Sequence, residues 1–225
     1  MLEHSREQSA AKHARARRRM VELQLAGRGI RDRRVLEAMA TVPRERFVPA
    51  AARAEAYSDR PLQNGRGQTI SQPYMVAAML EALDCHPEHV ALEVGAGSGY
   101  QAALLGELCA QVWAIELIEE LAAGARSALL DVGRDNVHVV VGDGTAGLPE
   151  HAPYDRIIVA AGAPEVPQPL IEQLADGGRL VLPVGSRVTQ ALVIVERHGD
   201  EVTQTPGMPC IFVPLVGRHG WRPDA

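Results

Sequence analysis

Short apolar runs alternate with amphipathic segments through the middle of the chain. The runs, which are typical of buried strands, occupy residues 90–94, 112–115, 137–141, 156–160 and 180–184. Between them, residues 100–109 and the segment that ends near Leu129 carry apolar positions at helical spacing. Strands that alternate with helices pair in parallel through right-handed crossovers. The pattern therefore predicts an α/β fold with a doubly wound, mostly parallel sheet.

The two ends of this pattern differ from its middle. Residues 20–42 hold two helical stretches, and Asp32 stands where it can cap the second one. Residues 63–68 are polar and rich in glycine, which is typical of a loop. Residues 191–196 and a segment that ends with residues 212–215 flank Gly199-Asp200, which favours an antiparallel pair. We therefore expect N-terminal helices and an antiparallel C-terminal edge.

Composition and charge narrow the class of protein. Hydrophobic residues make up 46% and charged residues 23%, which is typical of a globular chain. The formal net charge of -5 argues against nucleic acid as a partner, because phosphate binding needs clustered positive charge. No apolar run approaches the ~20 residues that span a bilayer, and none follows the basic residues of the N-terminus. We expect a cytoplasmic monomer without a membrane partner.

Cysteines and histidines give no sign of a metal site. Cys85, Cys109 and Cys210 lie far apart in the sequence and lack the spacing of metal ligands. Packed apolar thiols in a reducing compartment account for them. No His, Cys or Lys has an evident activating partner in the sequence. We therefore expect neither a bound metal nor a side chain that acts as a general base.

A glycine-rich segment follows the first predicted strand. Residues 93–99 read Glu-Val-Gly-Ala-Gly-Ser-Gly, and open sheets of this kind bind ligands beyond the carboxyl ends of their strands. Glu116 ends the second strand about 20 residues further on, where a carboxylate can accept hydrogen bonds from ribose hydroxyls. Asp143 follows the third strand, where it could recognise an adenine amino group. These features predict a nucleoside cofactor, with a solvated turn acid as the alternative for Asp143.

Two known sequence motifs, one for a dinucleotide cofactor and one for methylation of nucleic-acid amines, do not match this chain fully. A dinucleotide fingerprint needs a third glycine where this chain has Tyr100. A methyltransferase acting on nucleic-acid amines would show Asn or Asp, two prolines and an aromatic after the fourth strand, where residues 160–164 read Ala-Ala-Gly-Ala-Pro. Methyl transfer to a carboxylate remains open. A carboxylate acceptor is already ionised at neutral pH, so the reaction needs no general base and its rate depends mainly on how the two reactants are positioned.

One further segment carries a family resemblance. Residues 67–75 read Gly-Gln-Thr-Ile-Ser-Gln-Pro-Tyr-Met and, together with the glycine loop, closely resemble the protein-L-isoaspartate O-methyltransferase family. Other resembling segments, in family order from about Met20 to Gly217, lie at 42–48, 57–61, 163–167, 177–180 and 212–215. The resemblance implies a seven-stranded, Rossmann-like methyltransferase sheet. It implies S-adenosyl-L-methionine as donor and isoaspartyl peptides and proteins as acceptors.

The resemblance also implies roles for individual residues. Ser71 would be the active-site serine. The segment closing over cofactor and substrate would be Gln68, Thr69, Ile70 and Ser71. The cofactor would contact Gly95, Gly97 and Ser98 through its methionine part, Glu116 through its ribose, and Asp143 and Gly144 through its adenine. Glu93 would be the family's acidic residue before the glycine loop, and the acceptor peptide would lie beside Val213, Pro214 and Leu215.

Ser71 itself allows two interpretations. Its hydroxyl precedes a predicted helix and could donate a hydrogen bond that aligns the acceptor carboxylate, without acting as a nucleophile. The alternative is a helix cap with no chemical role. The two interpretations differ in what removal of the hydroxyl would do to turnover.

One domain is enough for this chain. With 225 residues it can form one α/β domain with a large core, and it is short for two. We expect a polar basic arm over residues 1–19, the methyltransferase domain over 20–217 and a tail over 218–225. Within the domain, residues 20–84 would form the N-terminal helices and substrate loop, and residues 85–217 the cofactor-binding sheet.

The sequence favours protein repair over three rival functions. We expect methylation of the α-carboxylate of L-isoaspartate, giving an ester that cyclises to a succinimide. A methyltransferase of the same fold could act instead on a small metabolite or another protein carboxylate. A non-catalytic sensor could hold the cofactor or nucleic acid, using the arginines at 15–19. A nicotinamide dehydrogenase is disfavoured by Tyr100.

Three places depart from the family pattern. Asn64 and Arg66 replace the residues expected between Pro61 and Gln68, and Pro209-Cys210-Ile211 replaces the usual run before Phe212. None of them falls in the predicted cofactor site. They leave the preference for particular peptides open.

Overall fold

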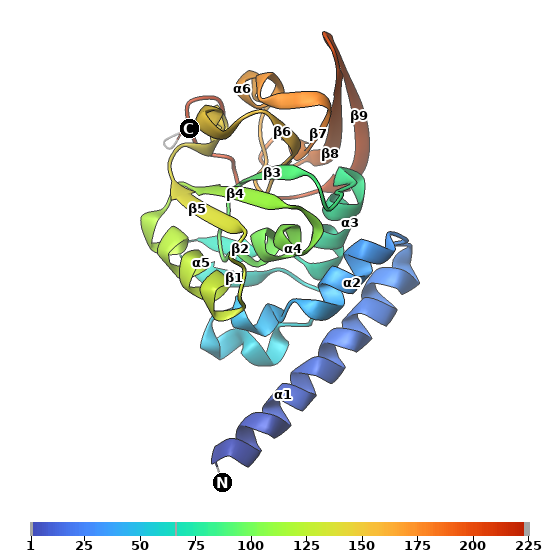
Figure 1. The fold of residues 1–225 in the computed structure, drawn as a ribbon, viewed down its shortest axis with the longest axis vertical. Coiled ribbons are helices and arrows are strands. Elements are labelled where there is room, and N and C mark those ends of the chain that lie inside the picture. The colour runs from blue at the N-terminus through green and yellow to red at the C-terminus, as the bar shows by residue number, and fades with distance from the viewer. Residues whose placement is uncertain (1, 66, 223–225) are drawn as a thin grey trace.

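A seven-stranded sheet forms the centre of the computed structural model, which describes residues 2–65 and 67–222 (Figure 1). The strand order is β5-β4-β3-β6-β7-β8-β9, parallel from β5 to β7 and antiparallel from β7 to β9. The strands are β3 (Val90–Val94), β4 (Gln111–Glu116), β5 (Val137–Val141), β6 (Tyr154–Val159), β7 (Leu174–Gly185), β8 (Gln190–His198) and β9 (Glu201–Cys210). The predicted doubly wound sheet and its antiparallel edge are confirmed.

Helices cover both faces of this sheet. They are α1 (Leu2–Arg19), α2 (Arg33–Thr41), α3 (Pro73–Leu83), α4 (Tyr100–Leu108), α5 (Glu119–Asp131) and the short α6 (Gln168–Glu172). Alternate residues of β3 pack into different core clusters: Ala91 joins the one that contains α3, α4 and α5, and Leu92 joins the one that contains Leu170 of α6. Burial on both faces explains why the parallel strands read as continuous apolar runs. No helix in the described chain is long and apolar enough to cross a membrane.

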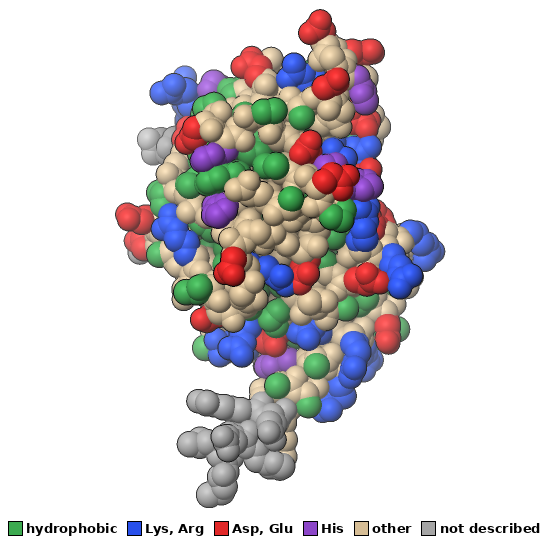
Figure 2. Space-filling view, viewed as in Figure 1, with side chains coloured by type: hydrophobic (Ala, Val, Ile, Leu, Met, Phe, Trp, Pro, Cys, Tyr) green, Lys and Arg blue, Asp and Glu red, His purple; other side chains and the backbone are tan. Residues whose placement is uncertain are grey.

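The N-terminal arm is helical in this structure. Helix α1 projects away from the body of the molecule (Figure 1), and Lys and Arg side chains lie along its described part (Figure 2). A π-helical turn over Met20–Leu25 joins it to the domain, and Met20 and Leu25 are buried there. The sequence predicted the polar, basic character of the arm but not its helical form.

A small hairpin forms where the sequence predicted a loop. Strands β1 (Leu62–Gly65) and β2 (Gln68–Ile70) pair antiparallel, so the loop prediction is wrong for these residues. Leu62 and Ile70 are buried at the paired ends of the two strands and fix the hairpin to the core. Arg66 and residues 223–225 of the predicted tail lie outside the described residues.

Two of the cysteines are neighbours in space. A hydrogen bond between Cys85 and Cys109, together with burial, raises the pKa of Cys85 well above its ordinary value. Burial also raises the pKa of Cys210, to about 11. A thiol that stays protonated is a weak nucleophile. Burial and the raised pKa values of Cys85 and Cys210 therefore agree with a packing role for these cysteines.

A buried arginine ties the N-terminal region to the domain. Arg44 is fully buried; its Nε donates to the carbonyl of Ala56 (2.7 Å) and its Nη2 to the carbonyl of Ser71 (2.9 Å). Its guanidinium carbon lies 4.8 Å from the centre of the Tyr100 ring. Burial lowers the pKa of Arg44, while the neighbouring Tyr100 opposes that shift. The Arg44 side chain therefore holds together three separate segments, which contain Ala56, Ser71 and Tyr100.

Replacing this arginine by an apolar residue is expected to destabilise the fold. Arg44→Met leaves the carbonyls of Ala56 and Ser71 without a donor, and each buried unsatisfied group costs about 1–3 kcal/mol. We expect the free energy of unfolding to fall by about 3 kcal/mol, measured by urea denaturation. Arg33→Met is the control, because Arg33 is exposed and bonds only to Glu37 across one helical turn. Equal losses in the two variants would contradict the role given to Arg44.

Candidate active site

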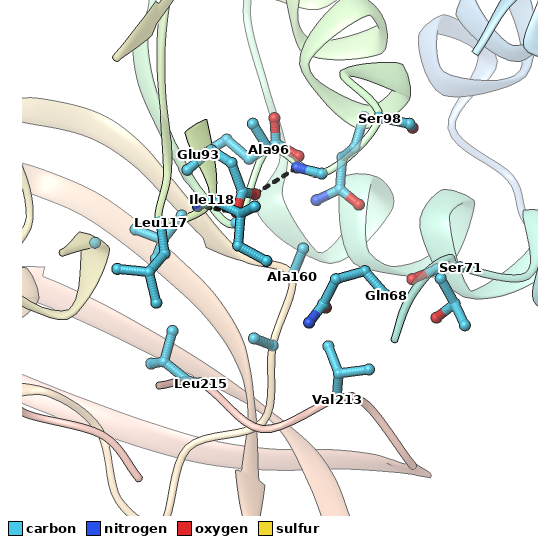
Figure 3. Close-up of a pocket in the computed structure, with 18 of the residues that line it drawn as sticks. Gln68, Ser71, Glu93, Ala96, Ser98, Leu117, Ile118, Ala160, Val213 and Leu215 are labelled. Atoms are coloured by element: carbon cyan, nitrogen blue, oxygen red, sulfur yellow. Dashed lines mark hydrogen bonds between the residues drawn. The ribbon is translucent and has the colours of Figure 1, made fainter. Parts of the chain in front are cut away.

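A pocket lies at the carboxyl ends of β3, β4 and β6. The strand order reverses at β3, because β4 lies on one side of it and β6 on the other, and such a reversal leaves a crevice for ligands. Figure 3 shows Gln68 and Ser71 from the hairpin side, Glu93 from β3 and Ser98 from the glycine loop around one space. Val213 and Leu215 border the same space from the C-terminal segment. Segments far apart in the sequence thus meet in one pocket.

Glycines allow the loop after β3 to turn sharply. Gly97 has φ +53 and Gly99 has φ +83, a region that side chains other than glycine rarely adopt. A Cβ on Gly99 would also lie 3.2 Å from the Cβ of Ala125, so the start of α4 packs closely on α5. These glycines therefore serve both the turn and the packing of two helices.

Glu116 holds the glycine loop in place. Its Oε2 accepts a hydrogen bond from the backbone N–H of Gly97 (2.8 Å), and its Oε1 accepts one from Ile118 (2.9 Å). The side chain is almost completely buried and lines the pocket. A carboxylate has about four acceptor positions, and these bonds use two. Glu116 can therefore accept further hydrogen bonds from a ligand.

Glu93 is a buried carboxyl group without a partner. It is fully buried, lines the pocket, and neither of its oxygens has a hydrogen bond to any described residue. Burial raises its pKa well above the ordinary value, and the nearby charge of Glu116 adds to this shift. Gln101, on the first turn of α4, also lines the pocket and has a buried, unpartnered Nε2. An unmet acceptor and an unmet donor therefore line the same pocket.

Asp143 is engaged elsewhere. Its Oδ1 accepts hydrogen bonds from the backbone N–H (3.0 Å) and hydroxyl (2.6 Å) of Thr145, and its Oδ2 accepts one from the N–H of Arg218 (2.8 Å). Partial burial alone would raise the pKa of Asp143, but these hydrogen bonds outweigh it and the pKa lies below its ordinary value. Gly144 lines the pocket, whereas Asp143 is not among the residues around it. The implied contact of Asp143 with adenine stays a prediction.

The bonds of Asp143 hold a C-terminal strap, residues 216–221, against the pocket. The N–H of His219 donates to the hydroxyl of Thr145 (3.0 Å), and the indole of Trp221 donates to the carbonyl of Gly162 (2.9 Å). At Gly217, φ is +155 and a Cβ would lie 2.1 Å from Oδ1 of Asp143, so a side chain does not fit there. Val216, the first residue of the strap, lines the pocket.

Ser71 lies at the pocket but does not cap a helix. The N-cap of α3 is Gln72, one residue later, and Pro73 is the first helical residue. Ser71 is half-buried, and its own carbonyl accepts the hydrogen bond from Arg44. The alternative interpretation of Ser71 as a helix cap is therefore wrong.

The structure brings nearly all the predicted site residues together. Those that line the pocket are Gln68, Thr69, Ile70, Ser71, Glu93, Gly95, Gly97, Ser98, Glu116, Gly144, Val213, Pro214 and Leu215. The pocket is also lined by residues that the sequence did not predict, among them Val76, Gln101, Ile118 and Ala160. Gln101 could have been found, because it follows the glycine loop on the first turn of a helix. Within residues 2–65 and 67–222, no cluster of three His, Cys, Asp or Glu side chains is suited to a metal ion.

Comparisons with known proteins agree on one family. The family model described as protein-L-isoaspartate(D-aspartate) O-methyltransferase matches residues 15–220. A protein-L-isoaspartate O-methyltransferase of Methanoregula boonei is 57% identical over 206 residues, covering 92% of this chain and 95% of the relative. One of Koribacter versatilis is 54% identical, covering 92% and 93%.

Solved structures agree on the fold. A protein-L-isoaspartate O-methyltransferase structure superposes with a TM-score of 0.82 at 28% identity, covering 90% of this chain and 67% of that chain. A Plasmodium falciparum structure, determined in complex with S-adenosyl-L-homocysteine, has a TM-score of 0.77 at 24% identity, covering 89% and 98%. At this identity, the second similarity concerns the fold alone.

The unpartnered carboxyl group predicts a pH-dependent stability. Because the pKa of Glu93 is raised in the folded protein, its contribution to folding stability is fully present below its pKa in the unfolded chain, about 4.3. This contribution is lost as the pH rises toward the pKa of Glu93 in the folded protein. Gln cannot ionise, so Glu93→Gln should become more stable than the parent, by about 1.4 kcal/mol for each pH unit in this window. Urea unfolding without ligand at pH 5, 6, 7 and 8 measures the difference.

An exposed glutamate provides the control for this experiment. Glu37→Gln makes the same change on a side chain that is 62% exposed, and its difference from the parent should stay nearly constant with pH. A difference for Glu93→Gln that is equally constant would show that Glu93 ionises normally in the folded protein.

Proposed function

The chain belongs to the protein-L-isoaspartate(D-aspartate) O-methyltransferase family, and we propose that it methylates the α-carboxylate of L-isoaspartyl residues in damaged proteins. The methyl donor is S-adenosyl-L-methionine, and S-adenosyl-L-homocysteine is released. The methyl ester then cyclises to a succinimide with loss of methanol, which begins the repair. The observation that carries the proposal is that the Ser71 hairpin and the glycine loop line one pocket (Figure 3).

The unmet polar groups of the pocket fit the methyl donor. S-adenosyl-L-methionine carries an ammonium and a carboxylate on one carbon, which match the acceptor oxygens of Glu93 and the donor Nε2 of Gln101. The free acceptor positions of Glu116 match ribose hydroxyls. When bound, the cofactor supplies an electrophilic methyl group on its sulfonium. Gly95, Gly97 and Ser98 allow the methionine part to approach the backbone closely.

The acceptor side of the pocket needs to position a group rather than activate it. An isoaspartyl carboxylate is already ionised at neutral pH, so no general base is needed. We assign to Ser71 a hydrogen bond from its hydroxyl to this carboxylate, which directs one carboxylate oxygen toward the donor methyl. Arg44 fixes the backbone of Ser71 by donating a hydrogen bond to its carbonyl. The apolar residues Val213 and Leu215 exclude water beside the acceptor peptide.

The setting of the reaction is part of the same proposal. We propose that the protein acts in the cytoplasm as a monomer on damaged proteins, without nucleic-acid or membrane partners. The net charge of -5 and three buried free cysteines support this setting. The division into a basic arm, a domain over residues 20–217 and a tail also stays a proposal, and α1 is the structural form of that arm.

Removal of the Ser71 hydroxyl should separate chemistry from cofactor binding. A hydrogen bond to a charged group is worth about 1.5–3 kcal/mol. We therefore expect Ser71→Ala to lower kcat/KM for an isoaspartyl peptide by about tenfold to a hundredfold, with binding of S-adenosyl-L-homocysteine changed less than about twofold. Radiolabelled methyl transfer and calorimetric titration measure the two quantities.

Two controls define the outcome of this experiment. Ser127→Ala, at an exposed position of α5, should leave both quantities unchanged. The matching aspartyl peptide should remain unlabelled by the parent enzyme. Unchanged turnover of Ser71→Ala would refute its assignment, and equal labelling of both peptides would favour a methyltransferase for other carboxylates.

The C-terminal strap should contribute to cofactor affinity. Trp221→Phe removes the hydrogen bond to Gly162 without touching Asp143, and a loosened strap should displace the pocket wall at Val216. We expect S-adenosyl-L-homocysteine to bind about threefold to tenfold more weakly, in line with the loss of one hydrogen bond. If Asp143 acted only through a direct contact with adenine, the affinity of Trp221→Phe would stay at the parent value.

A further inference from the structure

A second cavity adjoins the candidate active site. It has a volume of about 720 Å³ and shares four lining residues with the first pocket: Thr69, Ser71, Ala160 and Val213. A peptide whose isoaspartyl carboxylate reaches Ser71 therefore brings its neighbouring side chains to this cavity. The cavity is thus continuous with the site of the proposed function, on which this inference rests.

The remaining lining of this cavity is uncharged. Among the residues that the structure describes, these are Pro61, Gln72, Met75, Val188, Thr189, Gln190, Pro209, Cys210, Ile211 and Phe212. Arg187 is not among them, because its guanidinium carbon lies 5.0 Å from the centre of the Trp221 ring. A charged side chain placed here loses hydration without gaining a partner, whereas an apolar side chain gains by leaving water.

Two large apolar side chains at this cavity are unusually exposed. Ile211 is 74% exposed and Val188 is 77% exposed. They come from different segments, Val188 from the turn between β7 and β8 and Ile211 from the residue after β9. Exposed apolar side chains are common singly, but two that line one cavity form a surface that an apolar group can cover.

This surface is held in a defined position. The buried side chain of Gln190 donates to the carbonyl of Phe212 (3.2 Å) and accepts from its N–H (2.8 Å), which fixes the backbone next to Ile211. The turn that carries Val188 is closed by a backbone hydrogen bond from Ser186 to Thr189 (2.8 Å). A rigid apolar surface discriminates between side chains better than a mobile one, because less entropy is lost on binding.

We propose that this cavity binds an apolar side chain of the acceptor peptide, close in sequence to the isoaspartyl residue. Ile211 and Val188 are the residues that make such peptides better substrates than peptides with a charged side chain at that position. The substrate class is thus an isoaspartyl peptide with an apolar neighbour. The departure of Pro209-Cys210-Ile211 from the family pattern falls at this cavity.

A peptide panel tests the preference directly. Isoaspartyl hexapeptides are made identical except for Leu, Gln, Lys or Glu at one position, which is moved over the two residues on each side of the isoaspartate. We expect kcat/KM at one of these positions to be about tenfold higher for Leu than for Lys or Glu, the range expected for burying one apolar side chain. Equal values for Leu, Lys and Glu at every position would overturn the inference.

A charge introduced at the cavity tests the assigned residue. Ile211→Glu should lower kcat/KM for the Leu peptide about tenfold and raise it for the Lys peptide, so that the preference narrows or inverts. Leu130→Glu is a matched control, because Leu130 is 75% exposed on α5 and lines neither cavity. Its preference should equal that of the parent, and thermal unfolding of both variants checks that they fold.

The outcomes separate the two proposals. Equal changes of preference in Ile211→Glu and Leu130→Glu would show a general charge effect and overturn the role of Ile211. Failure of the parent enzyme to methylate any peptide of the panel would overturn the proposed function and this inference together. Methylation of the panel without preference would leave the proposed function standing and overturn only this inference.

Discussion

The two backbone hydrogen bonds that Glu116 accepts are the interaction on which the candidate site depends. They hold Gly97 and Ile118 to the end of β4, and so give the glycine loop its shape. With the loop fixed, Glu93 remains buried beneath it without a partner. The fold thus keeps one carboxylate satisfied and one unsatisfied within the same pocket. The ammonium group of the methyl donor, which we assign to Glu93, would give the second one a partner and so account for a destabilising group at this position.

Arg44 is a further buried charged group near the pocket, and it lies on the side that we assign to the acceptor. It is a buried cation without a carboxylate partner in the described chain, and it is stabilised by two carbonyls and the ring of Tyr100. Tyr100 begins α4, directly after the glycine loop, and Ser71 ends the hairpin segment. One side chain therefore connects the segment assigned to the acceptor with the helix that follows the cofactor loop. In-line methyl transfer requires this kind of fixed relation between two sites.

We assign the selectivity for acceptor peptides to the C-terminal third of the chain. The segment after β9 contributes Val213 to both cavities and Ile211 to the second one. The strap over residues 216–221 bonds to Gly162 through Trp221 and lines the first pocket through Val216. One continuous stretch thus lines the parts of the pocket that we assign to the acceptor and to the donor. Changes in this stretch can alter which peptides bind while Glu93, Glu116 and the glycine loop stay unchanged.

The sequence by itself determined the alternating strands and helices and the ligand site at the strand ends, because apolar periodicity and glycine spacing are local signals. Most of the predicted lining of the pocket came from the family resemblance of its segments. The sequence also predicted Glu116 and Ser71 as site residues, and both line the pocket. Only the tertiary structure decided that Asp143 bonds to the strap, that Arg44 joins three segments and that Ile211 and Val188 line one cavity. The hydrogen bonds of Arg44 and of Asp143 to the strap join residues 12 to 75 positions apart, and no local pattern encodes which distant groups will satisfy one another.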